Sequence, residues 1–215
     1  MRRVAPSILS ANPLRLFEEL SRIESYTDII HIDIMDGHFV PNLTFGPSLV
    51  KALKKEFAFE LDVHLMVTDP EKVIPWFAEA GADWISFHIE TQVHVHRYLT
   101  YLKERGVKAG IAINPTTPVS WLEEAIKYLD FVLILTVNPG YGGQPFIPEA
   151  LEKIEKLARM RKRGGYDFLI EVDGGVCPEN AGKLYSAGVD ILVAGSAVFN
   201  AEDPVQAIKK IKEAV

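Results

Sequence analysis

The sequence is poor in cysteine and has no long apolar run, and each absence excludes a class of protein. Cys177 is the only cysteine among 215 residues, so no disulfide can form within the chain. No stretch reaches the roughly 20 apolar residues that a membrane-spanning helix needs. The N-terminal MRRVAPSILSANP lacks the apolar core of a signal peptide. We therefore expect a cytoplasmic protein in a reducing compartment, with no membrane partner.

The chain also lacks an excess of positive charge and any compositional boundary. Its 23 lysine and arginine residues are outnumbered by 29 aspartate and glutamate residues, which gives a net charge of −6. Acidic and basic residues are interspersed, which argues against nucleic acid as a partner. No Ser/Gly-rich linker divides residues 1–215, so a single domain is expected.

Short β-rich runs alternate with longer segments of helical periodicity. Val205, Ile208 and Ile211, for example, would share one face of a helix. The eight predicted strands are residues 4–9, 28–34, 59–65, 83–89, 107–113, 131–137, 168–173 and 190–195. Eight strand–helix units predict a single-domain (β/α)8 TIM barrel. The alternative, a doubly wound open sheet, lacks its dinucleotide-binding fingerprint after the first strand.

Proline and glycine mark the expected ends of the helices. In four places a capping residue precedes a proline that would occupy the first helical position, where its missing N–H is not needed. These dipeptides are Asn12-Pro13, Asp69-Pro70, Thr117-Pro118 and Asp203-Pro204. Gly81, Gly106 and Gly188 stand just before predicted strands, which is typical of a left-handed residue that ends a helix.

Polar residues interrupt three of the apolar strands near their ends. His31 and Asp33 alternate with isoleucines, so these two side chains should point to the same face of their strand. His64 lies in FELDVHLMV, and Asp173 ends FLIEVD. In a barrel the C-terminal strand ends surround the active site. Two imidazoles and two carboxylates meeting there form a ligand set for one divalent cation.

Other polar residues of the strands are expected to have structural roles. Asp62 and Glu171 share the parity of the four ligands but lie deeper, so we expect buried, hydrogen-bonded positions. His88, in SFHIE, is expected to be a hydrogen-bonded neighbour of the site and not a fifth ligand. His38 is expected to have a surface or lid role, and His94 and His96 are expected at solvated positions.

Glycine-rich turns follow the last three strands and would lie beside the metal ligands. The turns are Gly140-Tyr141-Gly142-Gly143, Gly174-Gly175 and Gly195-Ser196. Glycine lets backbone N–H groups approach an anion, and a short helix over residues 196–200 would add its N-terminal dipole. Three such turns at consecutive strand ends predict a site for one phosphate group.

A metal beside a phosphate site suggests a phosphorylated sugar as the substrate. Asp33 and Asp173 come from different strands and could reach opposite faces of one carbon, so one would remove a proton and the other would return one. The cation would stabilise the enediolate charge, and no organic cofactor is needed. Two histidines with two aspartates suit Zn, Fe(II), Mn or Co better than Mg or Ca. No lysine stands at a strand end, which disfavours Schiff-base chemistry.

Six segments spread over the whole chain resemble the ribulose-phosphate 3-epimerase family. They are PSILSAN, HIDIMDGHFVPNLTFGP, LDVHLMV, NPGYGGQPF, VDGGV and VAGSAVF. The resemblance implies the reversible conversion of D-ribulose 5-phosphate to D-xylulose 5-phosphate on a (β/α)8 barrel. It also implies a place in carbohydrate metabolism, in the pentose phosphate pathway.

The resemblance assigns roles to residues at matching positions. It implies that His31, Asp33, His64 and Asp173 are the metal ligands, with Asp33 as the proton acceptor and Asp173 as the proton donor. The residues implied to bind substrate are Ser7, His64, Met35 and Met66 around the sugar, and Gly140, Tyr141, Gly142, Gly143, Gly174, Gly175, Gly195 and Ser196 at the phosphate. Leu135 stands where many members carry a third methionine.

Two other functions stay open at this point. A hexulose 6-phosphate 3-epimerase could use the same metal and enediolate geometry on a longer sugar. A non-catalytic barrel that binds sugar phosphates would be expected to have a damaged acid/base pair, whereas Asp33 and Asp173 are both present.

The loop over residues 37–46 is unusually apolar. Its side chains Phe39, Val40, Leu43 and Phe45 would be unfavourable if all four were exposed on a monomer. The loop could cover the substrate, pack against another subunit, or do both. We therefore expect a homo-oligomer of unknown order.

Overall fold

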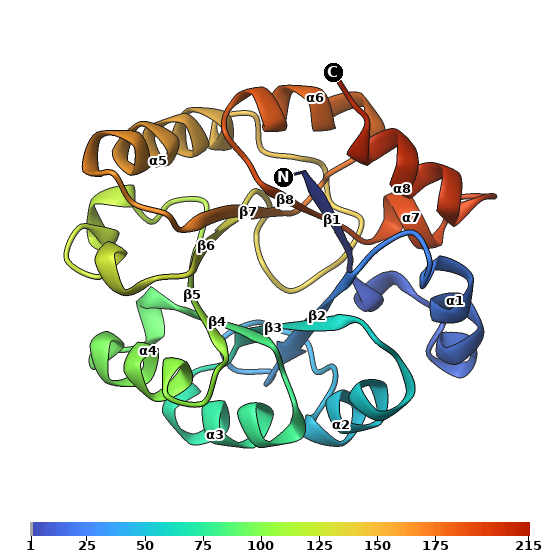
Figure 1. The fold of residues 1–215 in the computed structure, drawn as a ribbon, viewed down its shortest axis with the longest axis horizontal. Coiled ribbons are helices and arrows are strands. Elements are labelled where there is room, and N and C mark those ends of the chain that lie inside the picture. Colours follow the sequence, from blue (N-terminus) through green and yellow to red (C-terminus); the bar gives the residue numbers. More distant parts are fainter. Residues whose placement is uncertain (1) are drawn as a thin grey trace.

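The computed structural model describes residues 2–215, which form a nearly closed barrel of eight parallel strands with helices around it (Figure 1). The strands are β1 (Arg3–Pro6), β2 (Ile29–Met35), β3 (Glu60–Met66), β4 (Trp84–His88), β5 (Lys108–Ile113), β6 (Phe131–Leu135), β7 (Leu169–Asp173) and β8 (Ile191–Ala194). Neighbouring strands follow the order β1-β8-β7-β6-β5-β4-β3-β2. The predicted single-domain (β/α)8 TIM barrel is confirmed.

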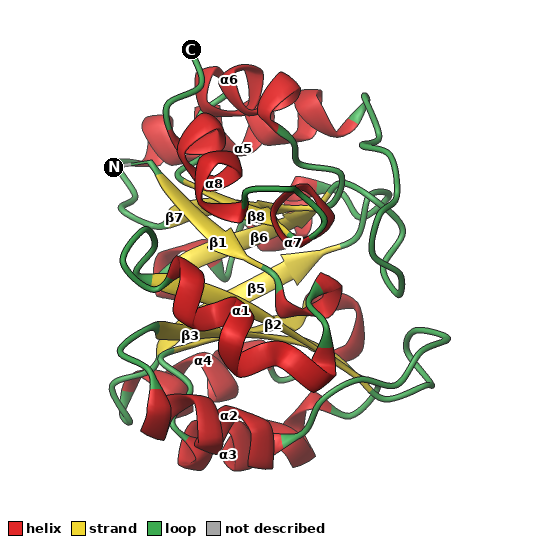
Figure 2. Cartoon of the chain, turned by 90° about the vertical axis from the view of Figure 1, so that its right-hand side faces the viewer, coloured by secondary structure: helices red, strands yellow, loops and turns green. Residues whose placement is uncertain are grey.

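Helices cover the outside of the barrel, with the strands enclosed between them (Figure 2). They are α1 (Leu16–Ile23), α2 (Pro47–Glu56), α3 (Pro70–Ala80), α4 (Val95–Lys103), α5 (Ala150–Gly164), α6 (Pro178–Ser186), α7 (Ser196–Phe199) and α8 (Pro204–Lys212). Pro70 and Pro204 occupy the first helical positions of α3 and α8, as predicted. Gly81 ends α3 at φ +100°, and Gly106 and Gly188 also have positive φ. Within residues 2–215, no helix has the length and apolar character needed to cross a bilayer.

The prediction of an α-helix after Thr117-Pro118 is wrong. The connection from β5 to β6 contains two short 3-10 helices, Val119–Leu122 and Ile126–Tyr128, with hydrogen bonds between residues three apart. A 3-10 helix rises about 2.0 Å per residue and an α-helix about 1.5 Å, so 3-10 helices cover a given distance between β5 and β6 with fewer residues. Asn12-Pro13 likewise opens a 3-10 turn, which leads into α1. The eighth α-helix, α7, belongs to the connection after β8.

Strand alternation divides the side chains between two environments. Ile30, Ile32 and Ile34 of β2 face outward into the main core between the barrel and its helices. Burial of each such side chain contributes roughly 1.5–3 kcal/mol to the free energy of unfolding. Inside the barrel, Trp84 and Phe131 pack at the N-terminal ends of β4 and β6 with their rings 5.1 Å apart. Apolar side chains therefore fill the N-terminal end of the barrel interior.

The barrel has one weakly paired junction, between β1 and β2, which we call the seam. β1 pairs with β8 along its whole length, but it meets β2 through a single bridge between Ser7 and His31. The Thr27 hydroxyl also donates across the seam to the carbonyl of Val4, at 2.7 Å. The seam therefore runs directly past a residue of the predicted metal site.

Candidate metal centre and substrate pocket

The four predicted metal ligands lie together at the C-terminal ends of β2, β3 and β7. One ligand atom each from His31, Asp33, His64 and Asp173 lies within 4.8 Å of the other three. Strand register explains part of this arrangement, because Asp33 is paired directly with His64. His31, Asp33 and His64 are buried, and Asp173 is half-buried.

The two nitrogens of His31 have different surroundings. Nδ1 donates a hydrogen bond to Asp62 at 2.5 Å. Nε2 is buried, has no hydrogen-bond partner among residues 2–215, and lies 3.3 Å from Asp33 Oδ1. Burial lowers the pKa of His31, but the charges of Asp62 and Asp33 outweigh it and raise the pKa well above its ordinary value. A divalent cation would supply the partner that Nε2 lacks, so these residues fit a metal ion.

Burial favours a neutral His64, whose ring offers a second candidate ligand nitrogen. Burial, aided by the neighbouring His88, lowers the pKa of His64 to about 4 in spite of Asp33. Its Nδ1 lies 3.2 Å from Asp33 Oδ1, and its Nε2 lies 2.9 Å from Nε2 of His88. A neutral imidazole is the form that binds a metal.

The two carboxylates of the centre, Asp33 and Asp173, differ in pKa. Burial raises the pKa of Asp33, but the charge of His31 and contacts with both imidazoles outweigh it and hold the pKa well below its usual range. Burial and the charge of Asp33 raise the pKa of Asp173 to about 7. The Ser7 hydroxyl donates to Asp33 Oδ2 at 2.7 Å. One carboxylate is thus held ionised, whereas the other exchanges its proton close to neutral pH.

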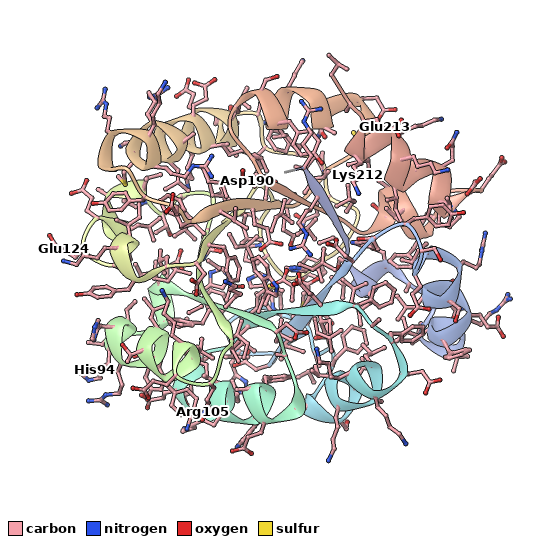
Figure 3. All side chains as sticks on the ribbon, viewed as in Figure 1. His94, Arg105, Glu124, Asp190, Lys212 and Glu213 are labelled. Atoms are coloured by element: carbon pink, nitrogen blue, oxygen red, sulfur yellow. The ribbon has the colours of Figure 1, made fainter. Side chains whose placement is uncertain are left out.

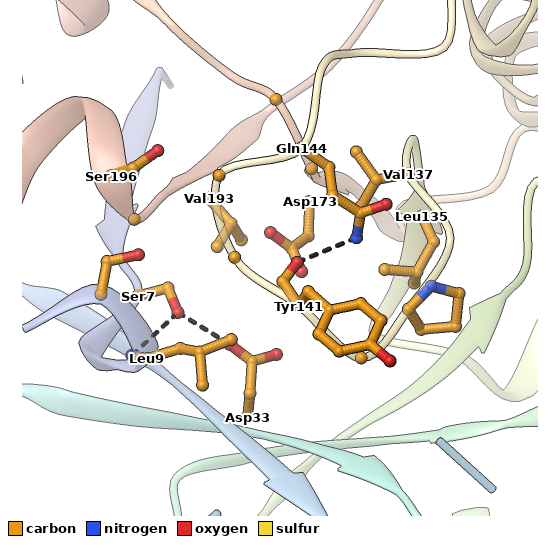
Figure 4. Close-up of a pocket in the computed structure, with 18 of the residues that line it drawn as sticks. Ser7, Leu9, Asp33, Leu135, Val137, Tyr141, Gln144, Asp173, Val193 and Ser196 are labelled. Carbon is orange, nitrogen blue, oxygen red and sulfur yellow. Dashed lines mark hydrogen bonds between the residues drawn. The ribbon is translucent and has the colours of Figure 1, made fainter. Parts of the chain in front are cut away.

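A pocket opens above the centre, between Asp33 on β2 and Asp173 on β7 (Figure 4). Ser7, Met35, Met66 and Leu135 line it on the side of the strands. The glycine-rich turns line the rest, through Gly140, Tyr141, Gly142, Gly143, Gly174, Gly175, Gly195 and Ser196. No lysine or arginine of the described chain lines the pocket, so an anion there would be held by backbone N–H groups and hydroxyls.

The structure departs from the predicted pocket in two respects. His64, predicted to contact substrate, is fully buried and lies below the pocket without lining it. Ser10 and Gln144 line the pocket but were not predicted. Gln144 donates to the carbonyls of Asn138 and Tyr141, at 2.6 and 2.9 Å, and so stabilises the conformation of the first glycine-rich turn. The sequence could indicate a pocket position for Gln144, because this residue directly follows the Gly-Tyr-Gly-Gly sequence.

The remaining polar residues mostly occupy the predicted positions. His88 contacts His64, which makes it a neighbour of the site as expected. His38, His94 and His96 are exposed, and His94 points away from the molecule in Figure 3. The predicted hydrogen-bonded position is wrong for Glu171. The residue is fully buried, but neither of its side-chain oxygens has a hydrogen-bond partner within the described residues. Burial and the charge of Asp62 raise the pKa of Glu171 well above its usual value.

The apolar loop over residues 37–46 is less exposed than predicted. Val40 is buried, and Phe39 packs against the ring of His88 with centroids 4.6 Å apart. Phe45 packs against the main core, which leaves Leu43 exposed at 73%. Because three of the four side chains find partners within the chain, the argument from exposure to a homo-oligomer fails. The homo-oligomer stays a prediction.

The same loop reaches the first glycine turn. Asn42 donates from Nδ2 to the carbonyl of Gly140 at 3.0 Å. Thr44 donates to the carbonyl of Asp33 and accepts from the N–H of Met35, so the loop is fixed to the end of β2. The loop thus connects the end of β2, where candidate metal ligands lie, to the first glycine-rich turn.

Replacement of Gly175 by alanine should disturb the glycine side of the pocket. Gly175 has φ +67°, and a Cβ there would lie 2.3 Å from the backbone nitrogen of Phe146. Gly143, at φ +74° with open space around it, is the matched control and should lose about 1–2 kcal/mol from strain alone. Gly175→Ala should lose more and should also raise KM for a phosphorylated substrate. Urea unfolding and kinetics would measure both effects, and equal losses in the two variants would contradict the clash.

The raised pKa of Asp173 predicts a pH-dependent stability of the metal-free protein. The folded chain binds this proton more tightly than the unfolded chain, so its contribution to stability falls as pH rises from about 4 to about 7. In excess chelator at pH 8, Asp173→Asn should therefore have a higher Tm than the parent. Each kcal/mol gained in the free energy of unfolding should raise the Tm by about 2–4 °C. Asp33→Asn, which removes the low-pKa partner of His31, should have a lower Tm. A lower Tm for Asp173→Asn would show that Asp173 is not under this strain.

Comparisons with known proteins agree on one family. A family model described as "Ribulose-phosphate 3 epimerase family" matches residues 3–199. The ribulose-phosphate 3-epimerase of Bacillus subtilis (strain 168) is 50% identical over 214 residues, covering 99% of each chain. That of Escherichia coli (strain K12) is 44% identical and covers 97% of this chain and 94% of its own.

Similarity to solved structures supports the fold alone. The 3-hexulose-6-phosphate synthase of Salmonella typhimurium superposes with a TM-score of 0.75 at 17% identity, covering 99% of this chain and 97% of that one. KGPDC from Streptococcus mutans gives a TM-score of 0.75 at 16% identity, covering 100% and 97%. These identities are too low to carry a substrate from one chain to another.

Proposed function

Because the chain belongs to the ribulose-phosphate 3-epimerase family, an isomerase family, we propose that it interconverts D-ribulose 5-phosphate and D-xylulose 5-phosphate. The observation that carries this proposal is the pair of unlike carboxylates, Asp33 and Asp173, which face one pocket from β2 and β7. An epimerisation needs one base and one acid on opposite faces of the same carbon. This pair supplies them without an organic cofactor.

Asp33 is the proton acceptor when the substrate is D-ribulose 5-phosphate. Its ionised carboxylate, oriented by the Ser7 hydroxyl, takes the proton from carbon 3. The electrons of the broken C–H bond move into the C2 carbonyl and give an enediolate. Asp173 then donates its proton to the other face of carbon 3, and the electrons return to re-form the carbonyl. The reverse reaction exchanges the two roles.

His31, Asp33, His64 and Asp173 would hold one divalent cation. When bound, that cation would attract the oxygens of the sugar and stabilise the enediolate charge. The protein's own part is to fix the ligand atoms. Asp62 fixes the ring of His31 through Nδ1, and register fixes Asp33 beside His64.

The two ends of the pocket suit the two ends of a pentulose phosphate. Met35, Met66 and Leu135 form an apolar wall beside the carboxylates, which would keep water from the reacting carbon. The glycine turns and Ser196 would bind the phosphate through N–H and hydroxyl groups. Leucine at position 135 preserves the volume of the wall and lacks only the sulfur contact.

A coupled assay tests the proposal. Metal-reconstituted protein would be supplied with D-ribulose 5-phosphate or with a hexulose 6-phosphate, each beside a chelator-treated control. We expect metal-dependent turnover of the pentulose. Turnover of the hexulose alone would replace the substrate and keep the mechanism. No turnover of either sugar would support a barrel that only binds sugar phosphates.

A further inference from the structure

Three side chains form a hydrogen-bonded row that ends at the predicted metal ligand His64. His88 Nε2 lies 2.9 Å from His64 Nε2, and His88 Nδ1 lies 3.1 Å from Glu90 Oε2. Both imidazoles are fully buried. Neither His88 nor Glu90 belongs to the ligand set, and Glu90 follows β4, a strand that carries none of the four ligands. The row therefore links the centre to a residue that the proton transfer does not use.

Glu90 is held so that only one of its oxygens can serve His88. Its Oε1 accepts from the backbone N–H of Asn114 at 2.9 Å and from the Thr117 hydroxyl. Lys153 donates to the carbonyls of Asn114 and Pro115, at 2.7 and 2.5 Å, and so fixes the segment that supplies these donors. Burial works to raise the pKa of Glu90, but the hydrogen bonds from His88, Thr117 and Asn114 outweigh it and lower the pKa to about 2.

The row ends at two carboxylates, Glu90 and Asp33, and an ionised carboxylate can only accept hydrogen bonds. His88 Nδ1 donates to Glu90, which leaves Nε2 of His88 as an acceptor. A cation on Nδ1 of His64 would leave the only proton of that ring on Nε2, and His88 Nε2, 2.9 Å away, is the acceptor for it. Without the cation, Asp33 competes for the same proton, because its Oδ1 lies 3.2 Å from Nδ1 of His64.

We propose that Glu90 is a positioning residue that, through His88, keeps the proton of His64 on Nε2 and so presents Nδ1 to the metal ion. This inference rests on the proposed metal centre. The position of the proton on an imidazole is set by the hydrogen bond of its other nitrogen. Here that control extends one imidazole further, to a carboxylate in the segment that follows β4.

Glu90→Gln should reverse the row. The backbone N–H of Asn114 can only donate, so it selects the oxygen of the introduced amide as its acceptor and turns the amide NH2 toward His88. His88 Nδ1 must then accept, its Nε2 carries the proton, and His64 is left protonated on Nδ1. We expect Zn²⁺ affinity, measured by competition with a chromophoric chelator, to fall about 10–100-fold. Long-range ¹H–¹⁵N spectra of the metal-free protein should show the proton of His88 moved from Nδ1 to Nε2.

Two further variants separate proton placement from packing. Glu90→Asp keeps an acceptor-only group and should bind Zn²⁺ more tightly than Glu90→Gln. Thr117→Val removes one donor to Glu90 but leaves the carboxylate facing His88, so it should stay within about threefold of the parent, well below the outer-shell effect. Melting temperatures would confirm that each variant is folded.

The proposal is overturned if Glu90→Gln leaves His88 protonated on Nδ1, or if Thr117→Val loses as much affinity as Glu90→Gln. A parent protein whose spectrum shows His88 protonated on Nε2 alone overturns it without any variant. Failure of the parent to bind Zn²⁺ at all would instead reject the proposed metal centre. The two failures are therefore distinguishable.

Discussion

Replacement of Asp173 by asparagine is expected to lower epimerisation about 10²–10⁴-fold, the usual contribution of a positioned acid or base. The amide fills the same space but cannot deliver a proton to the second face of carbon 3. Asp33 keeps its ability to remove and return a proton on its own face. The hydrogen at carbon 3 of D-ribulose 5-phosphate should therefore still exchange with solvent deuterium, which NMR of the sugar in D2O would record beside the coupled assay.

Asp33→Asn is the matched variant for this experiment. It should lose epimerisation as well, but it should exchange the carbon-3 hydrogen of D-xylulose 5-phosphate and not that of D-ribulose 5-phosphate. Both variants would be assayed at saturating metal, with the bound metal measured. Near-normal turnover by Asp173→Asn would contradict the two-carboxylate mechanism. So would exchange of both sugars by a single variant, because one base would then reach both faces.

Removal of the divalent cation is expected to lower turnover by about 10³-fold or more, because several kcal/mol of charge stabilisation would be lost. Zn, Fe(II), Mn or Co should restore the activity of the chelator-treated protein better than Mg or Ca, since the ligands include two imidazoles. Unchanged turnover in a protein shown to be free of metal would contradict the role of the cation.

The affinity for the cation should depend on pH in a definite direction. Burial lowers the pKa of His31, but the charges of Asp62 and Asp33 raise it well above its ordinary value, so in the metal-free protein a proton competes with the metal for Nε2 of His31. The dissociation constant should therefore rise by up to about tenfold for each unit that the pH falls below the pKa of His31. Competition with a chelator between pH 5.5 and 8 would measure this slope, and a flat profile would show that no proton is exchanged for the metal at His31.

The parts of the structure that the sequence predicted are those fixed by periodicity. Strand alternation placed His31 and Asp33 inside the barrel and the isoleucines of β2 outside it. Because parallel strands end at the same rim, their last residues had to meet. The glycine turns were found for the same reason, since each directly follows a strand.

The parts that were missed depend on contacts between distant segments. Nothing near Glu90 in the sequence indicates that its carboxylate is held by the segment after β5. The burial of Val40 and Phe39 depends on His88 and on the pocket wall, which periodicity does not report. Glu171 was expected to find a hydrogen-bond partner because most buried polar groups do. Its neighbour Asp62 instead bonds to His31, and the carboxyl oxygens of Glu171 are left without a hydrogen-bond partner among the described residues.

The seam between β1 and β2 is expected to make the orientation of Asp33 a late event in folding. Among the described strands, β1 has its full-length partner in β8, at the other end of the chain. Pairing between segments so far apart in sequence is slow to form. Ser7, which directly follows β1, donates to Asp33 across this seam. We therefore expect a chain that ends before β8 to leave Asp33 without a fixed Ser7 donor, so that the base is oriented only in the finished barrel.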